Sequence, residues 1–469
     1  MKQNYTPVPA DHEPKAFGLF VREKPFYKTF FSLLIVIALQ QLAALMVNLV
    51  DNIMLGSYTE LALNGATLVN QIQFMLQQVA IGTGMGIVVL GSQYWGKGQT
   101  DPIKKIISVG IKFGLLIGIL FFAAAQLFPH QLLNVFTNDE TIIAEGMRYL
   151  RVISWTYIIF AVSNSLMYSL QAVETAAIGT VMSISTIFIN LCLNYVFIYG
   201  HFGAPELGIV GAAVATLVSR SVELVIILVY VLFIDKKLHL RMRDLLQLDF
   251  TYLGDYFRVA TPVIVSGFLW GIAQAAQTAV LGHMSATAIA ANSISAVVSQ
   301  IFTIVGFSCA NVASIMMGKT IGEGKLHKVR AYSKSMQGLF LCIGLTLGVL
   351  MFLLKGPILS IYNISDETRR LTLQFLTVLS ITAVGSSYEF PCEGGIIAGG
   401  GTTKYQAYVD NLFIWLLVIP SASLSAFVFR FPPIVTFCCL KVDQVLKCIP
   451  NGIVTNRYHW VKILTKDAE

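Results

Sequence analysis

Residues 30–56 read FFSLLIVIALQQLAALMVNLVDNIMLG. The stretch is apolar almost throughout, and it is longer than the roughly 20 residues that an α-helix needs to cross the hydrocarbon core of a bilayer. Asp51 departs from this pattern, although a charged side chain near the centre of such a helix costs about 2.5–3.5 kcal/mol on insertion scales. The stretch therefore predicts a transmembrane helix in which Asp51 has a function. The alternative is a neutral, hydrogen-bonded Asp51 that holds two helices together.

The composition extends this interpretation to the whole chain. Of its 469 residues, 55% are hydrophobic and 12% are charged, and the mean hydropathy is +0.70. A soluble globular protein carries about 25% charged residues. The chain is therefore expected to be a multi-pass membrane protein. Residues 1–28 are polar and of mixed charge, so we expect the first apolar helix to stay in the membrane rather than to be cleaved as a signal peptide.

Twelve apolar stretches are candidate membrane spans. They lie near 30–55, 62–92, 105–128, 142–170, 177–200, 209–234, 255–281, 287–317, 331–354, 369–396, 406–429 and 433–454. Loops rich in Lys and Arg alternate with loops that lack them, and the basic loops share a side with both termini. The positive-inside rule then predicts a multi-pass protein of the inner (plasma) membrane with both termini in the cytoplasm.

One long polar connection divides the spans into two sets of six. The predicted organisation is a cytoplasmic tail (1–28), an N-terminal six-helix bundle (29–234), a cytoplasmic linker with an amphipathic helix (235–252), a C-terminal six-helix bundle (253–456) and a second cytoplasmic tail (457–469).

The two halves form an internal repeat. Gly56 and Gly282 each end a similar apolar segment, 226 residues apart. At the same spacing GKG (96–98) falls on GEG (322–324), so the register includes polar loop positions and not only apolar helices. Two halves that run in the same direction predict a pseudo-two-fold axis along the membrane normal. Secondary transporters with this plan bind their substrate between the halves and work by alternating access.

The repeat pairs Asp51 with Gln277. A residue needed only for packing is expected to be similar in both halves. The exchange of a carboxylate for an amide therefore favours an ion-coupled site in the N-terminal half.

Several motifs, taken together in their order and spacing, resemble the multidrug and toxic compound extrusion (MATE) family. They are VDNIMLG, VLGHMS, GSQYWGKG, NLCLNYVFIYGHFGAPELGIVGAAVAT, GGIIAGGGTTKY and LKVDQVLK. The resemblance implies an all-α membrane protein whose twelve helices form two six-helix bundles arranged as a V. It also implies antiport of organic, often cationic or amphipathic compounds against H⁺ or Na⁺.

The resemblance also suggests where the coupling ion binds. Many bacterial members use an Asp in the first helix and two polar residues in the fifth, which here fall on Asp51, Asn190 and Asn194. Some members have a second Asp where this chain has Asn194, so the choice between H⁺ and Na⁺ stays open. Asn190 and Asn194 are four residues apart and share a helix face. Their alternative role is hydrogen bonding between helices.

A second group of residues is predicted to line the substrate cavity. Trp270 stands where another branch of the family carries a Glu, and it could stack on a planar cation. Gln277 is the repeat partner of Asp51. Glu389, Glu393 and Asp443 are acidic residues in or near spans of the C-terminal half, where carboxylates attract cations. The alternatives are an interfacial anchor for Trp270 and an ion pair of Asp443 with the Lys four residues later.

Other functions fit the sequence less well. It has no Walker A pattern and no histidine cluster of the kind that binds a metal, so we expect neither a cofactor nor an enzyme. We expect a monomer that contacts small organic substrates and lipid, and not nucleic acid. The main alternative is a lipid-linked saccharide flippase, which needs cations to hold a pyrophosphate. Its only plausible candidates are Lys112, Arg148 and Arg151.

Overall fold

The computed structural model describes residues 20–466 except 248, 361 and 363, and no β-strand occurs in this part of the chain. The elements up to the linker are α1 (Lys24–Tyr58), α2 (Glu60–Gly96), α3 (Thr100–Leu127), α4 (Pro129–Asn134), α5 (Glu140–Ile153), α6 (Trp155–Ala172), α7 (Ala177–Tyr199), η1 (His201–Gly203), α8 (Ile209–Val229), η2 (Tyr230–Ile234) and α9 (Met242–Leu246). The later elements are α10 (Leu253–Gly282), α11 (Ala286–Gly322), α12 (Leu326–Leu359), α13 (Asp366–Phe390), η3 (Pro391–Ile397), α14 (Thr403–Phe413), η4 (Ile414–Val418), α15 (Ile419–Ser423), η5 (Leu424–Val428), α16 (Pro433–Lys441), α17 (Asp443–Leu446) and α18 (Cys448–Arg457).

These helices match the predicted membrane spans. Within the described residues, 10 helical segments are long and apolar enough to cross a membrane, and α5 and α6, which bend by 47°, make an eleventh if they count as one span. The last predicted span, 433–454, is divided into α16, α17 and α18. Val442 and Lys447 separate these three helices. Both residues keep right-handed helical backbone angles, so the chain stays helical from one piece to the next. The predicted all-α membrane fold is confirmed.

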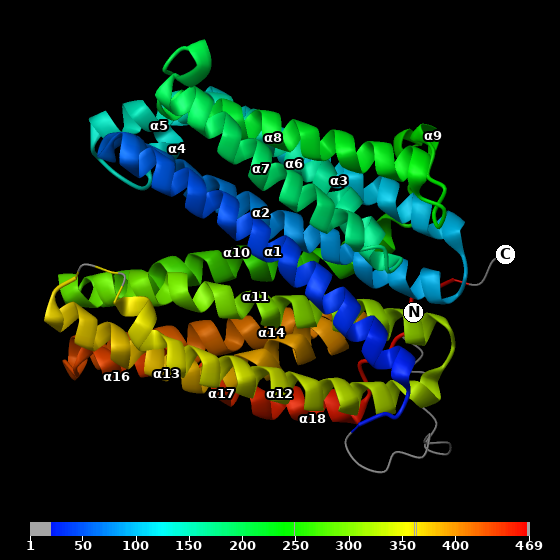
Figure 1. Cartoon of the computed structure of the whole chain (residues 1–469). Coiled ribbons are helices and arrows are strands. Elements are labelled where there is room, and N and C mark those ends of the chain that lie inside the picture. Colours follow the sequence, from blue (N-terminus) through cyan, green and yellow to red (C-terminus); the bar gives the residue numbers. More distant parts are fainter. Residues whose placement is uncertain (1–19, 248, 361, 363, 467–469) are drawn as a thin grey trace. The chain divides into compact units, whose positions relative to one another are not determined.

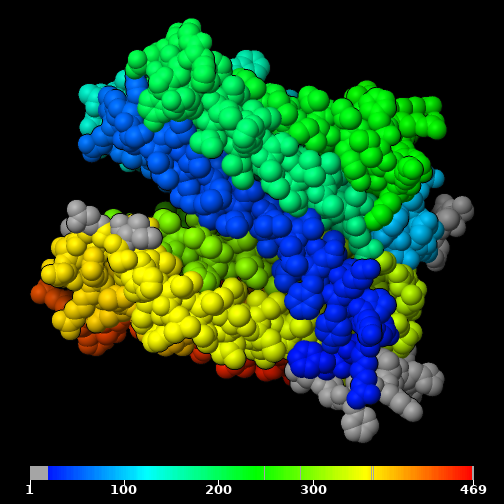
Figure 2. Space-filling view, viewed as in Figure 1, coloured from blue at the N-terminus to red at the C-terminus, as the bar shows by residue number. Residues whose placement is uncertain are grey.

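Helix α12 separates large from small residues. Leu345 and Leu353 of this helix are exposed. Figure 2 shows residues of α12 on the near surface of the molecule. Gly344 and Gly348 are buried on the opposite face, and a Cβ atom added to Gly348 would lie 2.5 Å from the carbonyl oxygen of Ser380. Small residues let helices approach closely where lipid supplies no hydrophobic driving force. The sequence of α12 therefore fixes which face meets α13.

The chain forms two compact units (Figure 1). Unit 1 comprises residues 1–34, 92–98 and 265–469, and unit 2 comprises residues 35–91 and 99–264. This division cuts through α1, α2 and α10, whereas the predicted bundles divide the chain at the linker. The bundle boundaries themselves stay a prediction.

The helix boundaries follow the internal repeat. Moved forward by 226 residues, α2 coincides with α11, since Glu60–Gly96 falls on residues 286–322. With the same shift, the first residue of α3, Thr100, falls on the first residue of α12, Leu326. The bent pair α5 and α6 falls on α13 followed by the π-helical segment η3. The 226-residue register is therefore visible in the lengths of the helices as well as in their sequence.

Within unit 1, two repeat-related glycines allow the ends of α2 and α11 to cross. A Cβ atom added to Gly322 would lie 1.9 Å from the carbonyl oxygen of Gln93, and one added to Gly96 would lie 2.1 Å from that of Lys319. Gln93 and Lys319 are themselves 226 residues apart. Each contact is thus the repeat equivalent of the other, as a local two-fold axis requires.

Candidate functional site

In unit 2, a closed ring of hydrogen bonds surrounds Asp51. Asn194 Nδ2 donates to Asp51 Oδ1 at 2.5 Å and to Asn190 Oδ1 at 3.1 Å. Asn190 Nδ2 donates to Thr216 Oγ1 at 3.1 Å, and Thr216 Oγ1 donates to Asp51 Oδ2 at 3.4 Å. We call these four residues the Asp51 ring. It joins α1, α7 and α8, and it brings together the three residues that were predicted as the ion site.

The pattern of α7 explains why its two amides point inward. Its buried residues recur every three or four positions and include Met182, Thr186, Asn190 and Asn194, whereas Phe188 lies on the exposed side. All four ring side chains are buried. Buried polar groups require partners, and the ring supplies them. Asn194 Oδ1 is the exception, because it has no hydrogen-bond partner.

Thr216 was missed by the sequence analysis. A threonine in an apolar span does not by itself indicate a site, because its hydroxyl can bond to a carbonyl of its own helix. Its place on the buried stripe of α8, beside Ala212, Ala213 and Ala215, is visible only when α8 is packed against α7.

Unit 1 contains a second buried polar group, centred on Lys447. The Nζ atom of Lys447 lies 2.9 Å from Asp410 Oδ1, 3.3 Å from Glu389 Oε2, 3.6 Å from Asp443 Oδ2 and 3.9 Å from Glu393 Oε1. We call these five residues the Lys447 cluster. Their side chains are between 0 and 14% exposed. The structure thus brings together three of the residues predicted for the substrate cavity.

Asp410 was missed although it lies inside a predicted span, where a carboxylate is a signal of function. Oxygen atoms of Glu389, Glu393 and Asp410 all lie within 4.8 Å of one another, close enough for one cation to bind them together. The Lys447 ammonium is the cation placed beside them. The spacing of four residues between Asp443 and Lys447 had predicted only their ion pair.

The other two predicted cavity residues lie on α10. Gln277 is buried and Trp270 is partly exposed, and both belong to unit 1. The ion pairs of Lys447 come from α13, η3, α14 and α17, not from α10. A role of Trp270 and Gln277 in substrate binding stays a prediction.

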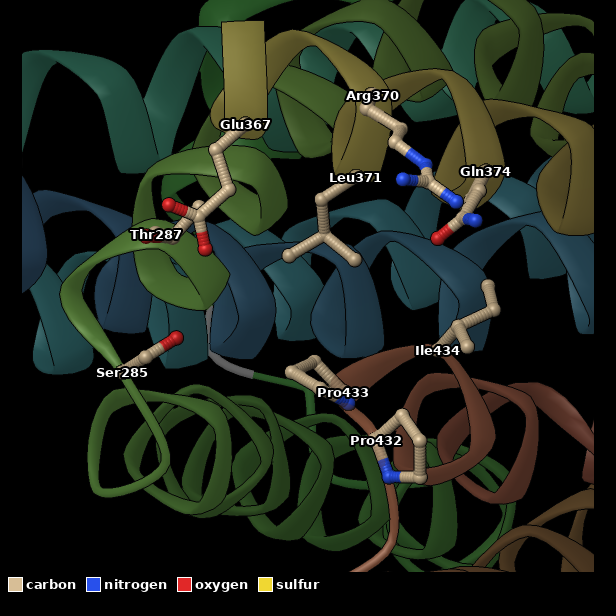
Figure 3. Close-up of a pocket in the computed structure, with 9 residues that line it drawn as sticks. All are labelled: Ser285, Thr287, Glu367, Arg370, Leu371, Gln374, Pro432, Pro433 and Ile434. Atoms are coloured by element: carbon tan, nitrogen blue, oxygen red, sulfur yellow. The ribbon is translucent and has the colours of Figure 1, made fainter. Parts of the chain in front are cut away.

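Unit 1 contains a separate pocket of about 260 Å³, and Figure 3 shows the residues that line it. It lies where the start of α13 meets the residues before α11 and α16, and Glu367, Arg370 and Gln374 supply its charged and amide groups. None of the residues predicted for the ion site or the cavity lines it. Its lining is Ser285, Thr287, Glu367, Arg370, Leu371, Gln374, Pro432, Pro433 and Ile434.

The three cations required by the flippase alternative have separate surroundings. Arg148 is exposed and pairs with Glu145 at 2.9 Å, and Arg151 is also exposed. Lys112 donates to the hydroxyl of Ser108 and to the carbonyl oxygen of Gln247 in the linker. These three residues therefore do not form one phosphate-binding cluster.

Known proteins resemble the chain over most of its length. A search against curated proteins finds the "Probable multidrug resistance protein NorM" of Thermotoga maritima, 26% identical over 376 residues that cover 79% of this chain and 80% of that protein. Among solved structures, a MATE protein in complex with MaL6 superimposes with a TM-score of 0.85 at 17% identity and covers 93% of this chain and 97% of its own. An outward-facing multidrug resistance MATE transporter gives a TM-score of 0.81 at 18% identity, with 96% and 98% covered.

The family model named MatE matches residues 37–196 and 262–424. The two matched segments correspond to the two halves of the repeat. The first includes three residues of the Asp51 ring, and the second includes three residues of the Lys447 cluster. The resemblance read from the sequence motifs is confirmed, and this family consists of transporters, not enzymes. The chain belongs to the MatE family of multi-pass membrane transporters.

Proposed function

We propose that this transporter exports small organic compounds, cationic or amphipathic, by antiport against H⁺ or Na⁺, with alternating access between its two halves. The Thermotoga maritima relative is named as a probable multidrug resistance protein, which supports the export of small organic compounds. The observation that supports ion coupling is the Asp51 ring. The Asp51 carboxylate is buried in a membrane span, and three polar side chains hold it there.

The ring can take up a proton with little rearrangement. A proton on Asp51 Oδ2 reverses one hydrogen bond, since the Thr216 hydroxyl can accept as well as donate. Na⁺ needs several oxygens, and the Asn190 and Asn194 amides would have to turn their oxygens toward it. The oxygen of Asn194 that lacks a donor is available for this. The geometry favours a proton, and Na⁺ is the competing outcome.

The gradient supplies enough free energy for export without ATP. One charge that moves inward gains about 2.3 kcal/mol per 100 mV of membrane potential. That free energy supports a concentration ratio of about 40 for a neutral substrate. In this proposal Asp51 is ionised while substrate is carried outward. It takes up a proton from the outer side as substrate leaves, and it returns neutral and releases the proton inside. Trp270 and Gln277 are proposed to line the path of the substrate.

We further propose a monomer of the inner (plasma) membrane with both termini in the cytoplasm and no cofactor. The flippase is the second candidate, and the separate surroundings of Lys112, Arg148 and Arg151 weigh against it.

The test is ethidium efflux from proteoliposomes that carry the wild type or Asp51→Asn, with ΔpH and Na⁺ gradients imposed separately. We expect ΔpH to drive ethidium efflux by the wild type. The ΔpH-driven efflux rate of Asp51→Asn should be at least ten-fold lower. Glu60→Gln is the matched control, because it makes the same carboxyl-to-amide change at an exposed site in unit 2.

Other outcomes have defined meanings. A response to Na⁺ alone would name the other ion. A variant that transports like the wild type would remove Asp51 from the mechanism. If neither protein moves the dye but labelled lipid-linked saccharide changes leaflet, the flippase is correct.

A further inference from the structure

The Lys447 cluster has too many carboxylates for its positive charge. Four carboxylates face one ammonium group, so the fully ionised cluster would carry a net charge of −3. An unpaired charge removed from water costs more free energy than most single interactions supply. Carboxylates that share a buried site therefore do not all ionise. By charge alone, the cluster requires additional bound cations.

The hydrogen bonds show which carboxylate oxygens lack a donor. Asn451 Nδ2 donates to Glu393 Oε2 at 2.8 Å, and the Tyr405 hydroxyl donates to Asn451 Oδ1 at 2.9 Å. The other oxygen, Glu393 Oε1, is fully buried and has no hydrogen-bond donor, and Lys447 is 3.9 Å away from it. Glu389 Oε2 also accepts no hydrogen bond and meets Lys447 only as an ion pair. Two buried oxygens thus point into the cluster without a proton donor.

Burial restricts the ligand to a very small one. The Glu393 side chain is fully buried and that of Glu389 is 5% exposed. Gly394 and Gly395, which follow Glu393, are buried as well, and a Cβ atom on Gly395 would lie 2.8 Å from the carbonyl oxygen of Ala310. An organic cation has no surface to bind here. A proton needs no cavity, because it adds to an oxygen that is already in place.

The helical backbone is irregular in all three segments that supply the cluster: α13 with η3, α14 with η4, and α17 with α18. Glu393 lies in the π-helical segment η3, and the π-helical segment η4 begins soon after Asp410. Lys447 itself stands at the break between α17 and α18. Such interruptions of the hydrogen-bond ladder are frequent at functional sites, and they let a helix bend locally. The cluster can therefore change its geometry when its charge changes.

Other titratable groups near the cluster do not remove its excess of negative charge. Tyr405, Cys392 and Cys448 face its carboxylates from α14, η3 and α18, and Lys441 faces Asp443 from α16. Phenol and thiol groups are ordinarily neutral near pH 7. A charged Lys441 beside Asp443 would still leave a net charge of −2 with all four carboxylates ionised. The four carboxylates are thus the groups that exchange protons.

We propose that the Lys447 cluster is a second proton-binding site of this transporter, separate from the Asp51 ring. A carboxylate, with Glu393 as the first acceptor, takes a proton from water on one side of the membrane. The same carboxylate releases that proton on the other side of the membrane. Only a proton is taken up and released, and no covalent bond between heavy atoms changes. Lys447 stays as the resident cation that holds the remaining carboxylates together. The role of this site in export rests on the proposed function, but its proton binding does not.

Proton binding is tested directly by infrared spectroscopy of the purified full-length protein in lipid at a series of pH values. We expect the carbonyl band of a protonated carboxylic acid near pH 7 in the wild type. This band should weaken in Glu393→Gln and in Asp410→Asn. It should persist in Asp51→Asn and in the control Glu367→Gln, which removes an exposed carboxylate of the same unit. Two cluster variants are used because one of them could fail to fold.

The absence of such a band in the wild type, or a band that survives in both cluster variants, would overturn the proposal. Coupling is measured next, as protons moved per ethidium exported from proteoliposomes. We expect Glu393→Gln to move about half as many protons per dye as the wild type. An unchanged ratio would refute the second coupling site. If no protein moves dye, the proposed export function fails, while the infrared result still decides whether the cluster binds protons.

Discussion

Thr216 is the residue that closes the Asp51 ring. It accepts from Asn190 and donates to Asp51, so it connects the amide side of the ring to the carboxylate side. A buried polar group that loses its partner costs about 1–3 kcal/mol. The contribution of Thr216 therefore exceeds that of its own two hydrogen bonds, because its loss leaves both neighbours incompletely paired.

We expect Thr216→Val, which keeps the shape of the side chain, to lower the free energy of unfolding by about 1–3 kcal/mol. The measurement is thermal unfolding of the detergent-solubilised protein. Thr346→Val is the control, because the exposed Thr346 hydroxyl donates only to the Cys342 carbonyl oxygen of its own helix. Equal unfolding temperatures for the two variants would mean that Thr216 does not hold the ring.

At the scale of elements, the linker is docked on α3 by polar contacts. Ser108 Oγ donates to the carbonyl oxygens of Leu245 and Gln247, at 3.2 and 2.9 Å. Lys105 Nζ lies 2.7 Å from Asp249 Oδ2. Hydrogen bonds from Lys105 and Thr251 lower the pKa of Asp249 to about 2. The linker helix α9 is thus tied to unit 2 rather than free in solution.

This docking is expected to depend on pH. Because the pKa of Asp249 is lower in the folded protein than its ordinary value, its stabilising effect is present above about pH 4 and is lost as the pH falls toward 2. At pH 7 we expect Asp249→Asn to speed amide hydrogen exchange in α9 by up to about five-fold, the range of a partly exposed ion pair. Asp101→Asn, which removes an exposed carboxylate 3.8 Å from Lys104, is the control. No change in exchange would show that the Lys105–Asp249 ion pair does not help to dock the linker.

The crossing of α2 and α11 makes a second prediction at this scale. Gly322→Ala places a Cβ atom 1.9 Å from the backbone oxygen of Gln93, and backbone cannot move aside as a flexible side chain can. Overpacking of this kind costs about 1–3 kcal/mol. We expect a lower unfolding temperature for Gly322→Ala than for Gly306→Ala, because a Cβ atom at Gly306 on the same helix meets nothing within 4 Å. Equal temperatures would mean that the two helices separate at no cost.

At the scale of the whole molecule, the two buried polar groups differ in their place in the repeat. The partner of Asp51 is Gln277, while Lys447 and Glu393 fall on Ser221 and Met167. The two halves share a backbone plan and helix lengths, yet the charged residues of each polar group fall on uncharged residues of the other half. The proposed division into two proton sites follows this asymmetry.

The topology of the whole chain yields a prediction that fusions can test. We expect a fluorescent protein at the C-terminus to fluoresce and alkaline phosphatase there to be inactive, since the basic loops lie on the side of the termini. Phosphatase inserted after Asn138, between the third and fourth predicted spans, should be active. Activity at the C-terminus would reverse the orientation.

The sequence predicts the fold better than it predicts the two buried polar groups. Apolar length predicts the spans, and a fixed register predicts the repeat, because both are local or periodic properties. The sequence also places Asp51, Asn190 and Asn194 together, through family resemblance and helical spacing. The ring of four and the cluster of five needed the structure, since Thr216 and Asp410 acquire partners only when distant helices pack.

The glycine crossing has a consequence for the origin of this chain. Gly96 meets Lys319 as Gly322 meets Gln93, so each half presents the same patch to the other. Such a contact is isologous, the kind that joins two identical subunits about a two-fold axis. A half-length ancestor could have dimerised through it before its gene was duplicated and fused. The Asp51 ring and the Lys447 cluster have no repeat equivalents, so in this history they are later acquisitions, made once the two halves were free to diverge.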